Sequence, residues 1–181
     1  NLDPVRVAED YATIDVLSGG RVELVLGRGS LFLRTYEGFG HDVATARERY
    51  DENVPLLVKL LSEENVHWAG DFRAPLTGHT TRPRPVADMP IWIGAGSKGS
   101  AELAADLGCW LMLPSVFGKP EMFVPIVDIY RARWESIGRD WADARVGACS
   151  HCFVGETTQQ ARARWEPYYR NYWEFVGDLL G

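Results

Sequence analysis

A glycine- and serine-rich segment in the middle of the chain is the strongest candidate for a ligand site. It reads Gly94-Ala95-Gly96-Ser97-Lys98-Gly99-Ser100, between the apolar run Ile91–Ile93 and a helical pattern. Glycines let a ligand approach the backbone, and a helix N-terminus offers free N–H groups and the positive end of its dipole. Ser97 and Ser100 add hydroxyl donors, and Lys98 adds charge. The segment predicts phosphate binding; the alternative is an ordinary strand-to-helix turn with a serine N-cap.

The same residues satisfy G-x-G-x-x-G, so an NAD-dependent dehydrogenase with an open sheet is an alternative. That fingerprint requires an acidic residue about 20 positions further on, at the end of the next strand. The next predicted strand ends in Leu113-Pro114-Ser115-Val116, which has no acid. The dinucleotide interpretation is therefore the weaker one.

A second glycine-rich turn, Gly27-Arg28-Gly29-Ser30, follows the apolar run Val22–Leu26. Ligands of α/β proteins sit at the carboxyl ends of such strands. Arg28 is at the position where its guanidinium could bind an anionic or electron-rich group of a ligand. An equally good interpretation is that Arg28 is a surface residue in a turn.

Histidines and cysteines give weaker signals. His41 and His151 are the candidates for a general base, since imidazole titrates near neutral pH. The alternative is that neither histidine takes part in catalysis, in which case His41 is a solvated loop residue. Cys149 and Cys152 form C-x-x-C, but strand positions three apart face opposite sides, which favours buried structural thiols over a redox or zinc pair. No metal site is predicted.

Helices and strands alternate along the chain, and repeated βα units predict a parallel sheet with right-handed crossovers. A loop is expected at 31–42, and a loop insertion with a short hairpin around Trp68–Phe72 at 66–90. A first helix is predicted from the cap at Asp3-Pro4 to the stop at Gly19-Gly20. The other predicted helices are Val43–Leu61, with a kink at Pro55, Lys98–Leu107, Pro120–Ile137, and Thr157 to about Val176, interrupted or kinked at Pro167. The predicted strands are Val22–Leu26, Ile91–Ile93, Cys109–Leu113 and Val146–Val154.

These strands are too few to close an eight-stranded βα barrel, which takes about 250 residues. The first helix presents an apolar face of Val7, Tyr11, Ile14 and Leu17, with no strand ahead of it to cover. We therefore predict an α/β fold of the (βα)8 TIM-barrel type, incomplete in this chain, with residues 1–181 as one domain. A small open sheet is the alternative.

Composition excludes several classes of protein. The net charge of −6 argues against a protein that binds nucleic acid or an anionic membrane, because such binding needs a positively charged surface. No apolar run approaches the roughly 18 residues of a membrane span. Since Asn1 leads straight into a capped helix pattern, no signal peptide is expected. Three cysteines make no disulfide framework, so a reducing, cytoplasmic setting is expected.

The segment Ala8–Gly29 resembles the signature region of luciferase-like flavin monooxygenases. Three later stretches fit in order: H-W-A-G-D-F at 67–72, R-P-R-P-V-A-D-M-P-I-W-I-G-A-G-S at 82–97 and A-A-D-L-G at 104–108. The resemblance covers most of the chain. It implies a βα barrel, often dimeric, with an insertion before one of the later strands.

The resemblance also implies a reaction. Reduced FMN, with a deazaflavin as the runner-up, would deliver one atom of molecular oxygen to a small-molecule substrate, and a separate flavin reductase would supply the reduced cofactor. A homodimer is expected. By this match Gly96, Ser97, Gly99 and Ser100 would hold the phosphate, and Gly94 and Ala95 are further cofactor-binding candidates in the same loop. Gly27, Arg28 and Gly29 lie beside the ribityl chain or ring.

The chain departs from the family pattern in two ways. By this resemblance we expect it to begin after the first three strands of the family's barrel and to stop before the last. Some members carry a histidine in the helix leading to an Arg-Tyr pair, whereas Arg49-Tyr50 follows Ala46 here. A flavin- or phosphate-binding barrel remnant without turnover is therefore the alternative to an enzyme.

Overall fold

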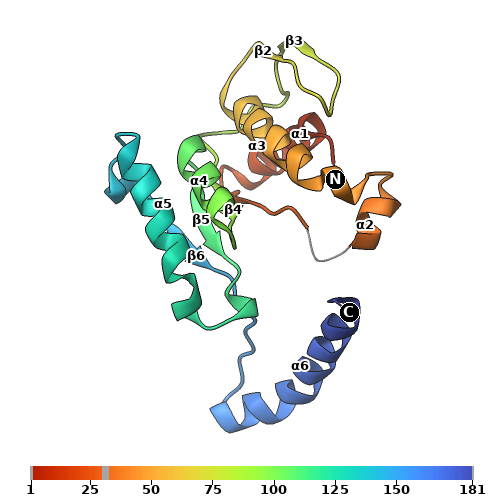
Figure 1. Ribbon diagram of the computed structural model, residues 1–181, viewed down its shortest axis with the longest axis vertical. Coiled ribbons are helices and arrows are strands. Elements are labelled where there is room, and N and C mark those ends of the chain that lie inside the picture. The colour runs from red at the N-terminus through yellow and green to blue at the C-terminus, as the bar shows by residue number, and fades with distance from the viewer. Residues whose placement is uncertain (1, 30–32, 181) are drawn as a thin grey trace.

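The computed structural model describes residues 2–29 and 33–180 and has an α/β architecture (Figure 1). Short 3-10 turns occupy Val43–Thr45, Ser115–Phe117, Pro120–Phe123 and Trp141–Asp143. The helices are α1 (Pro4–Ser18), α2 (Leu33–Gly38), α3 (Ala46–Ser62), α4 (Lys98–Leu107), α5 (Val124–Ser136) and α6 (Thr158–Leu180), and the strands are β1 (Leu24–Leu26), β2 (Val66–Trp68), β3 (Leu76–His79), β4 (Ile91–Gly94), β5 (Trp110–Leu113) and β6 (Val146–Ala148).

The predicted parallel sheet is confirmed. In the described part of the chain it has the order β1-β4-β5-β6, and all of its pairings are parallel. The register places Leu26 opposite Ile93, so Gly27 follows β1 beside Gly94. The two glycine-rich turns therefore leave the sheet at the same edge. The 66–90 insertion holds a separate antiparallel hairpin of β2 and β3.

Two apolar clusters hold the helices on the sheet. In one, Ile93 and Leu111 on the central strands are fully buried together with Tyr130 of α5. The Tyr130 hydroxyl donates to the Cys109 carbonyl at 3.0 Å, so this buried phenol has a partner. In the other, Leu24 of β1 packs with Leu56 and other residues of α3. α3 therefore covers β1, and α4 and α5 cover the centre of the sheet.

The buried face of α1 differs from the prediction. Val7 and Tyr11 of the predicted face are half-buried against the core, but Ile14 and Leu17 are 50% and 82% exposed. Ala8 and Ala12 are fully buried instead, because small side chains allow α1 to approach α3 closely. The expected end of the helix is confirmed, because Gly19 caps it in the left-handed conformation.

Asp15 joins two loops that lead into the sheet. Its Oδ1 accepts a hydrogen bond from the Val22 N–H at 3.3 Å, and its Oδ2 accepts from the Val86 N–H at 2.8 Å. The carboxylate is 2% exposed. One buried side chain therefore fixes the approaches to both β1 and β4.

Other predicted elements also change. The loop expected at 31–42 contains the helix α2 in its described part, and residues 31 and 32 lie outside that part, as does Ser30 of the first glycine-rich turn. The strand expected over 146–154 ends at Ala148, because only Val146–Ala148 pair with β5. On the predicted 120–137 helix the expected apolar face consists of Met122, Ile126, Ile129 and Ile137. Ile126 and Ile129 do pack against the core, but Met122 and Ile137 are exposed, and Tyr130 and Trp134 are the fully buried residues.

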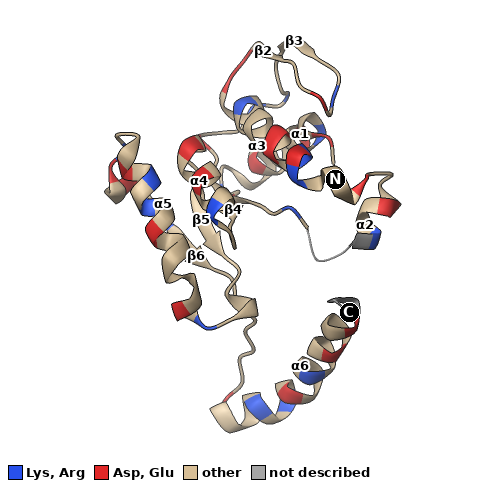
Figure 2. Cartoon of the chain, viewed as in Figure 1, with Lys and Arg blue, Asp and Glu red and all other residues tan. Residues whose placement is uncertain are grey.

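An extended segment after β6 leads to α6, which lies apart from the sheet and its covering helices in Figure 1. α6 is continuous through Pro167. Acidic and basic residues are interspersed over its length and over the other helices (Figure 2). Among the described residues, no helix is both long enough and apolar enough to cross a membrane.

Side chains tie the 66–90 insertion to α3. The Glu52 carboxylate accepts hydrogen bonds from the backbone N–H groups of Asp71 and Phe72. The Arg84 guanidinium donates to the carbonyls of Leu60 at 2.7 Å, Leu61 at 2.7 Å and Glu63 at 3.0 Å. Arg84 thus satisfies carbonyls that the end of a helix leaves without partners.

We expect Arg84→Ala to lower the free energy of unfolding by about 1–2 kcal/mol, since the helix-end carbonyls would lose their charged donor. Urea denaturation followed by circular dichroism measures the change. Arg162→Ala, at an exposed position on α6, is the matched control and should change stability by less than about 0.5 kcal/mol. Equal effects of the two substitutions would contradict a capping role for Arg84.

Candidate functional site

A cavity of about 460 Å³ lies at the carboxyl ends of β1, β4 and β5. Gly27, Arg28 and Gly29 form one part of its lining, and Gly96, Ser97 and Ser100 form another. Of the predicted cofactor residues, all except Ala95 and Gly99 line it. Ala95 is fully buried beneath the loop. The structure therefore brings the two glycine-rich turns, distant in sequence, to one cavity.

The start of α4 supplies hydrogen-bond donors to this cavity. Ser97 is the N-cap, with extended backbone, and its Oγ accepts from the Ser100 N–H at 3.5 Å. The Ser97 and Ser100 hydroxyls lie 3.2 Å apart. The other N–H groups of the first helical turn have no acceptor within the helix, so they are available to bind an anion. Two hydroxyls and a helix N-terminus thus face the same space.

The cationic partner at this helix start is not the lysine that the sequence suggested. Lys98 pairs with Glu102 of its own helix at 3.7 Å, its side chain is 72% exposed, and it is not part of the cavity lining. Arg47, from the first turn of α3, lines the cavity instead, together with Arg28. Sequence reasoning missed Arg47 because nothing in its local pattern links it to a loop fifty residues later.

Tyr50 lies on α3 close to Arg47 and also lines the cavity. Its hydroxyl donates to the Leu26 carbonyl at 3.3 Å. Burial raises the pKa of Tyr50 to about 12, with the nearby Arg47 guanidinium acting in the opposite direction. The phenol is therefore neutral at physiological pH. Tyr50 also lines a neighbouring cavity of about 260 Å³ between α1, α3 and β1.

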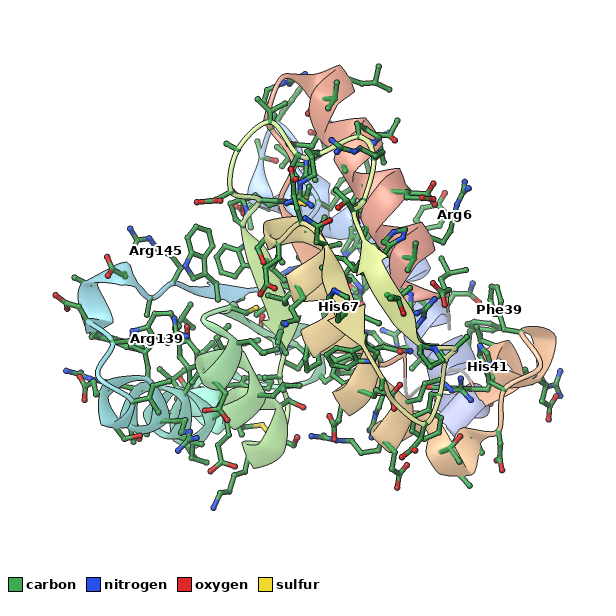
Figure 3. The ribbon with its side chains drawn as sticks, turned by 90° about the horizontal axis from the view of Figure 1, so that it is seen from above. Arg6, Phe39, His41, His67, Arg139 and Arg145 are labelled. Carbon is green, nitrogen blue, oxygen red and sulfur yellow. The ribbon has the colours of Figure 1, made fainter. Side chains whose placement is uncertain are left out.

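The two histidine candidates lie elsewhere. His41 follows α2 beside Phe39 (Figure 3) and lines a separate cavity of about 130 Å³ with Arg49 and Phe72. His151 is exposed beyond β6, and its ring makes a T-shaped contact with Tyr172 of α6 at a centroid distance of 4.8 Å. Neither histidine lines the cavity that holds the glycine-rich turns. A role for either as general base stays a prediction.

The C-x-x-C motif differs from the buried structural thiols that we expected. β6 ends at Ala148, so Cys149 and Cys152 lie beyond the strand and are exposed. Cys109, at the start of β5, is buried, and its burial raises the pKa of its thiol to about 12. Of the three cysteines, Cys109 alone is buried in the core.

Labelling with a thiol reagent at pH 8 should therefore modify Cys149 and Cys152 in the native protein and leave Cys109 unmodified, because the thiolate is the reactive form. Peptide mass spectrometry identifies the modified sites. The same reagent in denaturant should label Cys109 as well. Native labelling of Cys109 at the rate of the other two would show that this part of the core is open.

Comparison with known proteins agrees with this arrangement. Residues 1–178 match the family model described as luciferase-like monooxygenase. The chain belongs to the luciferase-like monooxygenase family. Solved TIM barrels of this family share its fold: monooxygenase RslO1 from Streptomyces bottropensis aligns over 99% of the chain with a TM-score of 0.88 and 24% identity, and the match covers 55% of that protein.

Curated relatives of this luciferase-like chain have names that point to two cofactors. The oxygenase component of a flavin-dependent trigonelline monooxygenase from Acinetobacter baylyi is 23% identical over 88% of the chain and 44% of its own length. An F420-dependent glucose-6-phosphate dehydrogenase from Kineococcus radiotolerans is 29% identical over 76% of the chain and 41% of its own length. The chain spans about half the length of the relatives it matches. The names of these two relatives mention flavin and F420, and they give no support to the NAD-dependent alternative.

Proposed function

We propose that this chain carries the flavin site of a luciferase-like monooxygenase that uses reduced FMN to place one atom of molecular oxygen on a small-molecule substrate. The observation that supports the proposal is the single cavity shared by Gly27–Gly29 and the start of α4. A separate flavin reductase and a homodimeric assembly are part of the proposal.

The residues at the cavity fit the cofactor. Ser97, Ser100 and the first-turn N–H groups of α4 form a donor set suited to a phosphate. A Cβ on Gly94 would lie 3.3 Å from the Leu26 carbonyl oxygen, so glycine there allows the two loops to run close together. Arg28 and its flanking glycines would then border the ribityl chain or ring.

Bound reduced FMN supplies the electrons that activate dioxygen. The chain's own contribution is binding, orientation and exclusion of water. Pro114 and Phe117 give the cavity an apolar wall after β5, and Tyr50 adds a neutral phenol that does not ionise in the working pH range. Among the described residues that line this cavity, the titratable side chains are Arg28, Arg47 and Tyr50, and none of them is acidic.

A deazaflavin cofactor is the second candidate, because an F420-dependent relative is 29% identical over 76% of this chain, beside 23% over 88% for the flavin-dependent one. A binding protein without turnover is the third. Anaerobic titration with reduced FMN, F420 and NADH separates the cofactors by their absorbance changes. Saturable binding of reduced FMN supports the proposal, and saturation with NADH or F420 alone overturns it.

Oxygen consumption by the protein with bound reduced FMN then separates an enzyme from a binding protein. Substrate-dependent uptake that is coupled to oxygenated product, detected by mass spectrometry with labelled dioxygen, supports turnover. Uptake that releases only hydrogen peroxide, with every candidate substrate, would favour the binding protein.

A further inference from the structure

We propose that Arg47 binds the cofactor's phosphate and makes this site selective for a terminal phosphomonoester, as in FMN, over a phosphodiester, as in F420. The inference rests on the proposed function, because it concerns the phosphate end of the same cofactor. It goes further in assigning the cation and in choosing between the two cofactors that the relatives use.

The orientation of Arg47 is fixed from one side. Its Nε lies 2.6 Å from Oδ2 of Asp51, one turn further along α3. Its Nη1 lies 3.4 Å from the Ser100 hydroxyl at the start of α4. The ion pair with Asp51 therefore occupies the Nε edge of the guanidinium and leaves the two Nη groups directed at the helix start. A planar guanidinium held in this way is suited to forked hydrogen bonding to phosphate oxygens.

Gly99 provides the space for this contact. A Cβ at Gly99 would lie 3.0 Å from Nη2 of Arg47 and 3.7 Å from its Cζ. The guanidinium thus lies directly against the first turn of α4, where a larger residue would displace it. Gly99 does not line the cavity itself, and this packing gives a physical reason for a glycine at that position.

The charge around the cavity favours a doubly charged ligand. Arg28 and Arg47 both line it, no acidic side chain does so among the described residues, and Asp51 contacts Arg47 only at the Nε edge. The dipole of α4 adds partial positive charge. A phosphomonoester carries close to two negative charges at neutral pH, whereas a diester carries one.

The number of donors leads to the same choice. A monoester presents three terminal oxygens to the guanidinium, the two serine hydroxyls and the helix N–H groups. A diester presents only two such oxygens, and its second ester substituent occupies space next to the same hydrogen-bond donors. We therefore expect FMN to bind more tightly than F420.

Fluorescence titration of the full chain with FMN, riboflavin and F420 tests the inference. Arg47→Met should weaken FMN binding by about 10- to 100-fold and leave riboflavin binding unchanged, because riboflavin lacks the phosphate. Arg47→Lys should fall between, since it keeps the charge and loses the fork. Arg6→Met is the matched control and should leave both affinities unchanged. Arg6 also pairs with an acid one turn away, on α1, and does not line this cavity.

Gly99→Ala is the second variant, and it should shift the guanidinium by a few tenths of an ångström without removing it. We expect a smaller loss of FMN binding than in Arg47→Met, with riboflavin binding unchanged, and unchanged circular dichroism and thermal midpoint show that the fold is kept. Equal loss of FMN and riboflavin in Arg47→Met, no loss of either, or wild-type binding of F420 as tight as FMN overturns the inference. If the wild-type protein binds neither FMN nor riboflavin, the proposed function itself fails.

Discussion

Replacing Asp15 with alanine should lower the free energy of unfolding by about 2–4 kcal/mol, because two backbone N–H groups would lose their acceptor. The carboxylate is buried and accepts from Val22 at 3.3 Å and from Val86 at 2.8 Å. Alanine leaves both N–H groups without a partner where the protein chain excludes water. The effect should extend to the cavity, since these loops lead into β1 and β4.

Chemical denaturation gives the stability change, and the FMN affinity measured on the still-folded variant gives the effect on the cavity. Asp15→Asn keeps one accepting oxygen and should cost less than the alanine variant. Asp10→Ala, which removes only an exposed ion pair with Arg6 on the same helix, should cost less than about 1 kcal/mol. An Asp15→Ala protein as stable as the Asp10→Ala control would contradict the bridging role.

The Ser97→Ala, Ser100→Ala double variant should weaken FMN binding by at least about 100-fold, since it removes two hydrogen bonds to a charged group, each worth about 1.5–3 kcal/mol. Riboflavin binding should change by less than about threefold. The two hydroxyls lie 3.2 Å apart at the helix start, where a single phosphate can accept from both.

Equilibrium titration with both flavins measures this difference. Ser115→Ala provides a matched control, because its hydroxyl also lies beyond a sheet strand but donates to the Cys149 carbonyl and does not line the cavity. If the double variant loses both flavins equally, the phosphate does not bind at the start of α4.

Much of the cavity could be predicted from local sequence. A strand, a glycine-rich turn and a serine N-cap are encoded by consecutive residues, and Gly94–Ser100 folds as expected, with Ser97 as the cap. The alternation of strands and helices likewise predicted the parallel sheet, which places Gly27 beside Gly94. These features depend on contacts between sequence neighbours or on general rules of chain connection.

The features that were missed depend on tertiary packing. Arg47 reaches the start of α4 because of the way α3 is oriented on the sheet, and this orientation is set by tertiary packing. The exposed Leu17 and buried Ala12 of α1 show the same limit, since hydrophobicity alone does not reveal which face of a helix meets a close neighbour. Cys149 and Cys152 were assigned to a strand whose sheet partner ends before them.

The pairing of β1 with β4 has a consequence for the order of folding. β4, α4, β5, α5 and β6 follow one another closely in the chain, whereas β1 reaches β4 only across α3 and the whole 66–90 insertion. Closing that long loop costs conformational entropy before any strand contact is made. We expect residues 91–148 to form the early folding nucleus and β1 to dock late, so the cavity between them is completed in one of the last steps of folding.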